Sequence, residues 1–138
     1  MQISKDTAIH LANAVELGDL NALGRLARGL INGDVGGGKH ELTASGPVAE
    51  GVDVVALNNE TVAVAATILD LSAHRGMLAI VDASASGTAA HTVTVTNGTL
   101  DGSHKVATLN APGEMLLVYV SEDGNGTVIL NNGGVALS

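Results

Sequence analysis

Five histidines are the residues of this sequence best suited to acid–base chemistry or metal binding: His10, His40, His74, His91 and His104. Two imidazoles aim at one metal ion when they stand four residues apart on a helix or two apart on a strand. No two histidines have either spacing, so we interpret each one as a surface or turn residue. If the chain forms a trimer, one histidine per subunit near the axis could still build a shared three-histidine site.

The segment from Gly33 to His40, GDVGGGKH, has the spacing of a phosphate-binding P-loop as far as Lys39. A P-loop lies after a strand and before a helix, and a Ser or Thr follows its lysine to hold Mg2+. Here the predicted order is a helix, then the glycines, then a strand, and His40 takes the place of the hydroxyl. We therefore interpret the glycine-rich segment as a linker.

Two further segments contain residue types used in catalysis or calcium binding. Residues 122–126, EDGNG, place two carboxylates and an amide in a glycine-rich turn, but no bidentate acid follows before the chain ends at Ser138. Residues 84–88, SASGT, lack the G-x-S-x-G pattern of a nucleophile elbow. We interpret both as turns, and we predict that the chain is not an enzyme and has no catalytic residues, no metal site and no cofactor.

Composition and charge exclude several classes of partner. The chain of 138 residues has a net charge of −8, which opposes binding to the phosphates of nucleic acids. No run approaches the roughly 20 apolar residues of a membrane span, and the N-terminus lacks the pattern of a signal peptide. Aromatic residues make up 1% of the chain, so we expect a core of Ala, Val, Leu and Ile. Such small side chains bury less area each, and association with other subunits would offset this.

Residues 1–34 are predicted to form an N-terminal helical segment used for docking or oligomerisation. Apolar residues recur at helical spacing between Ser4 and Asn32, and Gly18-Asp19 divides the segment into two short helices, unless one helix continues through it. Helices this short need a partner, which is either the body of the same chain or a neighbour. The candidate contacts to a capsid or to other subunits are Ile3, Ile9, Val15, Leu20, Leu23, Leu30 and Ile31.

Residues 35–138 are predicted to form a β-domain, because short apolar runs alternate with turn dipeptides. Strands are expected at 40–44, 52–57, 61–71, 77–82, 91–96, 105–109, 115–121, 127–131 and 134–137. In the strand at 61–71, one face carries Val62, Val64, Ala66 and Ile68, and small residues line the other. The fold class is mainly β, an antiparallel β-sandwich, jelly roll or barrel-like domain preceded by the helical segment.

The stretch from His91 to Ser138 resembles the C-terminal β-segments of small virion proteins of tailed bacteriophages, notably head decoration proteins. Residues 98–102, GTLDG, residues 106–113, VATLNAPG, and residues 131–138, NNGGVALS, support this resemblance. It implies a homotrimer that binds the major capsid protein on the outer capsid surface and stabilises the shell, assembled in the host cytoplasm. The alternatives are a head-fibre or tail-associated module that binds the host, and a small jelly-roll enzyme. We expect neither nucleic acid nor membrane as a partner.

Overall fold

The computed structural model describes residues 38–138, and these residues form ten strands and one 3-10 helix. The strands are β1 Gly38–Leu42, β2 Gly46–Pro47, β3 Val52–Leu57, β4 Ala65–Asp70, β5 Gly76–Asp82, β6 His91–Asn97, β7 Val106–Leu109, β8 Met115–Val120, β9 Gly126–Asn132 and β10 Ala136–Leu137. The 3-10 helix η1, Leu71–His74, follows β4 directly. Each predicted strand overlaps an observed one, although the strand predicted at 61–71 spans only Ala65–Asp70 and β2 was not predicted. The prediction of a mainly β chain is confirmed for the described residues. The predicted helical segment 1–34 lies outside them.

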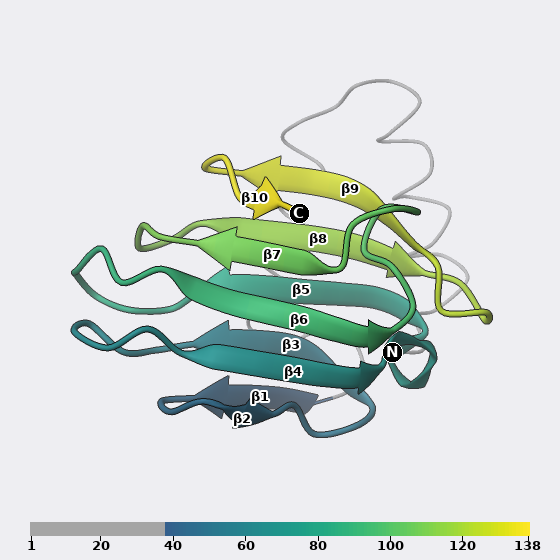
Figure 1. Ribbon diagram of the computed structural model, residues 1–138, viewed down its shortest axis with the longest axis horizontal. Helices are drawn as coiled ribbons and strands as arrows, with labels where there is room; N and C mark the ends of the chain where they lie inside the picture. Colours follow the sequence, from purple (N-terminus) through teal and green to yellow (C-terminus); the bar gives the residue numbers. More distant parts are fainter. Residues whose placement is uncertain (1–37) are drawn as a thin grey trace.

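The strands belong to two five-stranded sheets. Sheet A has the order β1-β3-β5-β8-β9, and sheet B has the order β10-β7-β6-β4-β2. Figure 1 shows the sheets as two layers, with sheet B nearer the viewer. Each sheet ends in two edge strands, so neither sheet closes into a barrel.

The first six strands correct the prediction of an antiparallel fold. From β1 to β6 the chain alternates between the sheets, and each of the strands β3 to β6 pairs in parallel with the strand two places earlier. The last four strands pair antiparallel. In sheet A, β8 pairs with β5 and β9 pairs with β8; in sheet B, β7 pairs with β6 and β10 pairs with β7. Both sheets are therefore mixed. The prediction was wrong for the first half because a strand's hydrophobic pattern is the same beside a parallel and an antiparallel neighbour.

The two sheets share one core, made almost entirely of aliphatic side chains as the composition predicts. Its largest fully buried members come from both layers and include Leu57 and Ile80 of sheet A and Ile68 and Leu109 of sheet B. Packing of two sheet faces in this way produces a single hydrophobic layer about 10 Å thick. No helix in the described part of the chain is long and apolar enough to cross a membrane.

The two sheets differ in how their outer faces are buried. The strands β4 and β6 of sheet B alternate between buried and more exposed residues, the pattern of a sheet with one face in solvent. In sheet A all six residues of β3 are buried, as are six of the seven residues of β5 and five of the six of β8. Strands buried on both faces read as continuous apolar runs, and the runs VDVVAL, MLAIVD and MLLVYV have this character.

Glycines in the predicted turns adopt the conformations that such turns need. Gly102 of the Asp-Gly pair has φ 90° and Gly113 of the Pro-Gly pair has φ 85°, a region that other residues rarely adopt. These two turns precede β7 and β8, so they help to set where the last antiparallel strands begin. The interpretation of the glycine dipeptides as turns is confirmed here.

Candidate functional site

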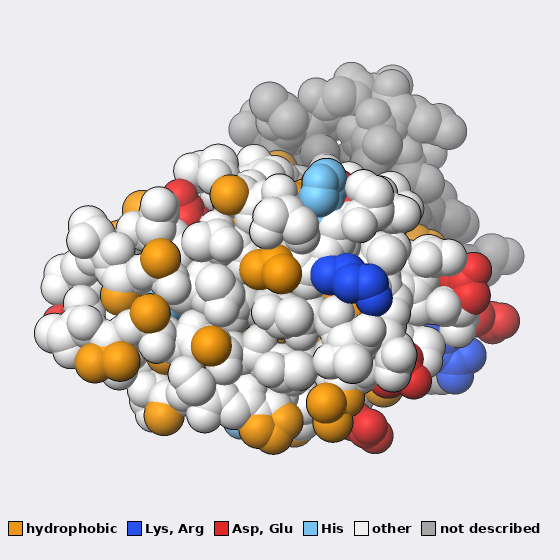
Figure 2. Space-filling model, viewed as in Figure 1, with side chains coloured by type: hydrophobic (Ala, Val, Ile, Leu, Met, Phe, Trp, Pro, Cys, Tyr) orange, Lys and Arg blue, Asp and Glu red, His pale blue; other side chains and the backbone are white. Residues whose placement is uncertain are grey.

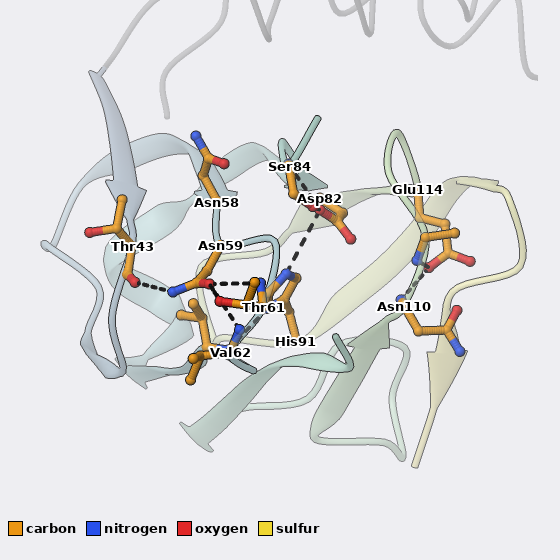
Figure 3. A network of polar contacts seen from close by, with 12 residues as sticks. Thr43, Asn58, Asn59, Thr61, Val62, Asp82, Ser84, His91, Asn110 and Glu114 are labelled. Atoms are coloured by element: carbon orange, nitrogen blue, oxygen red, sulfur yellow. Dashed lines mark hydrogen bonds and ion pairs between the residues drawn. The ribbon is translucent and has the colours of Figure 1, made fainter. Parts of the chain in front are cut away.

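The most buried polar cluster of the described chain joins the two sheets at one end of the layers. Asp82, the last residue of β5, is 2% exposed, and His91, the first residue of β6, is 1% exposed. The Nε2 atom of His91 lies 3.9 Å from Oδ1 of Asp82, and the Ser84 hydroxyl donates a hydrogen bond to the same carboxylate oxygen. The backbone N–H of Ser84 also donates to Oδ1 at 3.0 Å. Figure 3 shows Ser84 and His91 on either side of the Asp82 carboxylate.

The proton arrangement of His91 follows from its second ring nitrogen. The backbone N–H of Val64 donates to Nδ1 of His91 at 3.0 Å, so Nδ1 is the unprotonated nitrogen and Nε2 carries the proton that faces Asp82. The imidazole thus links the segment before β4 to the end of β5. Its role in the fold is to tie sheet B to sheet A by polar contacts at the rim of the apolar core.

The arrangement does not have the geometry of a Ser-His-Asp catalytic triad. In a triad the histidine contacts the serine and removes its proton, and the carboxylate orients the histidine from the far side. Here Asp82 lies between Ser84 and His91, so the serine hydroxyl is paired with the carboxylate. All three side chains are also buried, Ser84 at 7% exposure. The observed contacts favour a structural role for this cluster.

Two neighbouring loops at this end are held by side-chain caps. The Oε2 atom of Glu114 accepts the backbone N–H of Asn110 at 2.7 Å, which closes the turn between β7 and β8. The Oδ1 atom of Asn59 accepts the N–H groups of Thr61 and Val62 at 3.0 and 2.9 Å, which turns the chain before β4. Val62 is 61% exposed whereas Val64 and Ile68 are buried, which corrects the prediction that the three share one face. Figure 3 shows these caps on both sides of the buried cluster.

The other described histidines are scattered over the molecule. His74 is 1% exposed, and its Nδ1 donates to the carbonyl of Val52 at 2.9 Å, so this nitrogen carries a proton. His40 lies on the edge strand β1, where its Nδ1 accepts the N–H of Ala49 at 3.0 Å. The interpretation of every histidine as a surface or turn residue was therefore wrong for His74 and His91. His10 lies outside the described residues.

One exposed turn pairs a histidine with a carboxylate. The Nδ1 atom of His104 lies 2.7 Å from Oδ2 of Asp101, and the N–H groups of Ser103 and His104 donate to Oδ1 of Asp101. Hydrogen bonding from the His104 side chain and backbone holds the pKa of the Asp101 carboxyl well below its usual range. These contacts stabilise the charged carboxylate and fix the turn before β7.

The acidic segment 122–126 forms a turn, as predicted. Oδ1 of Asp123 accepts the Ser121 hydroxyl and the N–H of Asn125, and these bonds lower the pKa of Asp123. The Asp123 carboxylate therefore accepts its hydrogen bonds from within its own turn. Across residues 38–138, no group of three or more His, Cys, Asp or Glu side chains is placed to hold a metal ion.

The outer face of sheet B is partly exposed along its strands, unlike the outer face of sheet A. The register places its residues in two cross-strand rows, Ala65-Thr92-Thr108-Ala136 and Pro47-Thr67-Thr94-Val106. None of these eight residues is charged. Figure 2 shows this side of the molecule with small hydrophobic side chains scattered over it, a basic side chain and a histidine among them, and acidic side chains towards its margins. In a chain of net charge −8, this face is a region nearly free of acidic groups.

The predicted contact residues cannot be located on the fold. Ile3, Ile9, Val15, Leu20, Leu23, Leu30 and Ile31 all lie outside residues 38–138. Of the P-loop-like segment, Gly38, Lys39 and His40 belong to β1, so a strand follows the glycines as expected. No known protein family and no curated protein matches this chain.

Sequence reasoning missed the buried Asp82–His91 contact, although one signal of it was present. His91 has the same parity as Val93 and Val95, and the alternation of β6 places all three on the inner face. A polar residue at an inner position needs a partner, and this requirement pointed to a buried acceptor nearby. The identity of Asp82 could not be deduced, because it lies on a strand of the other sheet.

Proposed function

We propose that this protein is a non-enzymatic virion structural protein, a decoration protein that binds the outer surface of a tailed-phage capsid as a homotrimer. The resemblance of residues 91–138 to such proteins motivates this proposal. In the fold this stretch covers β6 to β10, which contribute strands to both sheets and most of the hairpin turns. The major capsid protein is the proposed partner.

The observation that best supports the proposal is the outer face of sheet B, where neither of the two cross-strand rows contains a charged residue. Capsid shells present broad, shallow surfaces, and a flat sheet face with short side chains can approach such a surface closely. Thr92, Thr94 and Thr108 offer hydroxyls for hydrogen bonds without the desolvation cost of a buried charge. The near absence of acidic groups there avoids concentrating the chain's net negative charge at the contact.

The polar clusters on the same fold favour this class over a hydrolase. Asp82, Ser84 and His91 are buried and engaged with one another or with backbone groups. A catalytic site needs its reacting groups to face a cleft that substrate can enter. The side chains with the chemistry for catalysis are thus engaged in structural contacts.

The experiment is sedimentation of the purified full chain with tailed-phage particles from its own source. The protein should move with the particles to saturation, and the free protein should have the mass of a trimer by light scattering. Protein that stays at the top of the gradient at every ratio would overturn capsid binding. A strict monomer at about micromolar concentration would overturn the trimer.

A further inference from the structure

The outer face of sheet A is apolar and buried, although it lies on the side away from sheet B. Alternation along β3, β5 and β8 places Val55, Ile80 and Leu116 in the shared core. The residues between them point to the opposite side and are not members of the core. This outer apolar face consists of Val54, Ala56, Ala79, Val81, Met115 and Leu117, each 8% exposed or less.

The register groups these six residues into one continuous patch. Val54 pairs with Ala79, which pairs with Leu117, and Ala56 pairs with Val81, which pairs with Met115. The patch therefore crosses the three central strands of sheet A in two adjacent rows. On the flanking strands Lys39, Glu41 and Asn132 are exposed, so a polar margin bounds it.

A patch of this kind needs a cover, and the described chain does not supply one. Residues 38–138 form two layers, and sheet B occupies only the inner side of sheet A. A contiguous apolar surface larger than a few hundred Å2 is rarely left in water on a soluble protein. The largely apolar sequences of β3, β5 and β8 also indicate that this face is covered, because strands of a sheet with one face in water alternate between apolar and polar residues.

The chain that precedes β1 has the length, position and composition to be this cover. It enters sheet A at Gly38, the first residue of the edge strand β1, so its residues begin beside the patch. Leu20, Leu23 and Leu30 recur there at helical spacing. A helix of about 14 residues is about 21 Å long, and five strands span about 19 Å across a sheet. Each of the two predicted helices would therefore cross sheet A once.

We propose that residues 1–37 pack on the outer apolar face of their own sheet A and form a third layer of the domain. The small residues Ala56 and Ala79 stand diagonally in the two rows and allow a helix to approach the sheet closely. The sequence left two possible partners for the N-terminal segment, the body of the same chain and a neighbouring subunit. The proposal selects the body of the same chain. Sheet B is then the sheet face that remains free for another molecule.

Cysteine reactivity tests this arrangement on the full chain, which has no cysteine of its own. Three single variants are compared: Ala79→Cys on the outer face of sheet A, Ala107→Cys in the shared core and Thr94→Cys on the exposed face of sheet B. We expect the thiol at position 79 to react at least about 100-fold more slowly than that at position 94. Equal rates at positions 79 and 94 would overturn the proposal.

Variants within the N-terminal segment identify the cover. Adding Leu20→Asp and Leu23→Asp should raise the reactivity at position 79 about tenfold and leave position 107 unchanged. If position 107 also becomes reactive, the whole domain has opened, and the milder Leu23→Ala replaces the pair in the same comparison. Unchanged protection at position 79 in a folded variant would show that something else covers the face.

A mixing experiment distinguishes the chain's own segment from that of a second copy. The Ala79→Cys chain is refolded with an excess of the Leu20→Asp/Leu23→Asp chain, which has no cysteine. Protection at position 79 should persist, because the cysteine-bearing chain has its own intact segment. Loss of protection in the mixture would mean that a neighbouring copy supplies the cover, and it would overturn the assignment.

Discussion

The imidazole of His91 and the carboxylate of Asp82 face each other across 3.9 Å, with both side chains almost fully buried. They connect the start of β6 in sheet B to the end of β5 in sheet A. The ten residues from Asp82 to His91 are thereby closed at both ends by one polar contact. This loop contains Asp82, Ser84 and His91, whose side chains most resemble catalytic groups. Their contacts with one another and with backbone groups favour a structural role.

Coupling between His91 and Asp82 should be measurable by a double-mutant cycle. His91→Leu removes the acceptor of the Val64 N–H and the group facing Asp82, and should lower the free energy of unfolding by about 2–4 kcal/mol. Asp82→Asn keeps an oxygen for the Ser84 N–H. Denaturant unfolding of the two single variants and the double variant should give a coupling above about 0.5 kcal/mol. Additive effects would show that the two side chains do not interact.

Stability in acid should depend on Asp101. Hydrogen bonds from His104 and the N–H groups of the turn lower the pKa of Asp101 in the folded state. The stabilisation that Asp101 gives to the fold is therefore complete above its pKa in the unfolded chain, about 3.9. This stabilisation is lost as the pH falls below about 3.9 and through the lower pKa of the folded state. Asp101→Asn should therefore be less stable than the native chain at pH 7, and the difference should shrink in thermal melts below about pH 4. Glu50→Gln, at an exposed carboxylate, is the control; a pH-independent gap for Asp101→Asn would contradict the linkage.

Gly126 should tolerate no side chain. A Cβ there would lie 2.3 Å from the carbonyl oxygen of Leu100, which is backbone and cannot rotate away. Gly126→Ala should lower the free energy of unfolding by about 1–3 kcal/mol through this overlap. Gly46→Ala is the matched control, because a Cβ at that strand position meets nothing within 4 Å. Equal denaturation midpoints for the two variants would show that the chain relaxes freely around position 126.

The outer face of sheet B should be needed for particle binding. Thr94 is exposed at its centre, so Thr94→Arg should weaken co-sedimentation with particles at least about tenfold while leaving the thermal midpoint close to native. Thr127→Arg adds the same charge at an exposed position on β9 of the other sheet. Binding should survive in Thr127→Arg. The reverse pattern would place the contact on the opposite side of the molecule.

The strands could be predicted because the local signals that make them are present in the sequence. The alternating valines and threonines of 91–96 define both faces of β6, and the bounds predicted for β3 are the observed ones. The parallel order of β1 to β6 could not be predicted, since it depends on which sheet each strand joins after crossing the core. The backbone partners of His74 and His91, which are Val52 and Val64, were missed for the same reason. They lie 22 and 27 residues away in the sequence.

Copy number in purified particles tests the central claim most directly. Quantitative mass spectrometry of gradient-purified phage from the protein's own source gives the ratio of this chain to the major capsid protein. A capsid decoration protein should be present at a fixed ratio in every preparation, in whole trimers per capsid. Absence from the particles, or a ratio that varies with washing and falls towards zero, would contradict the account.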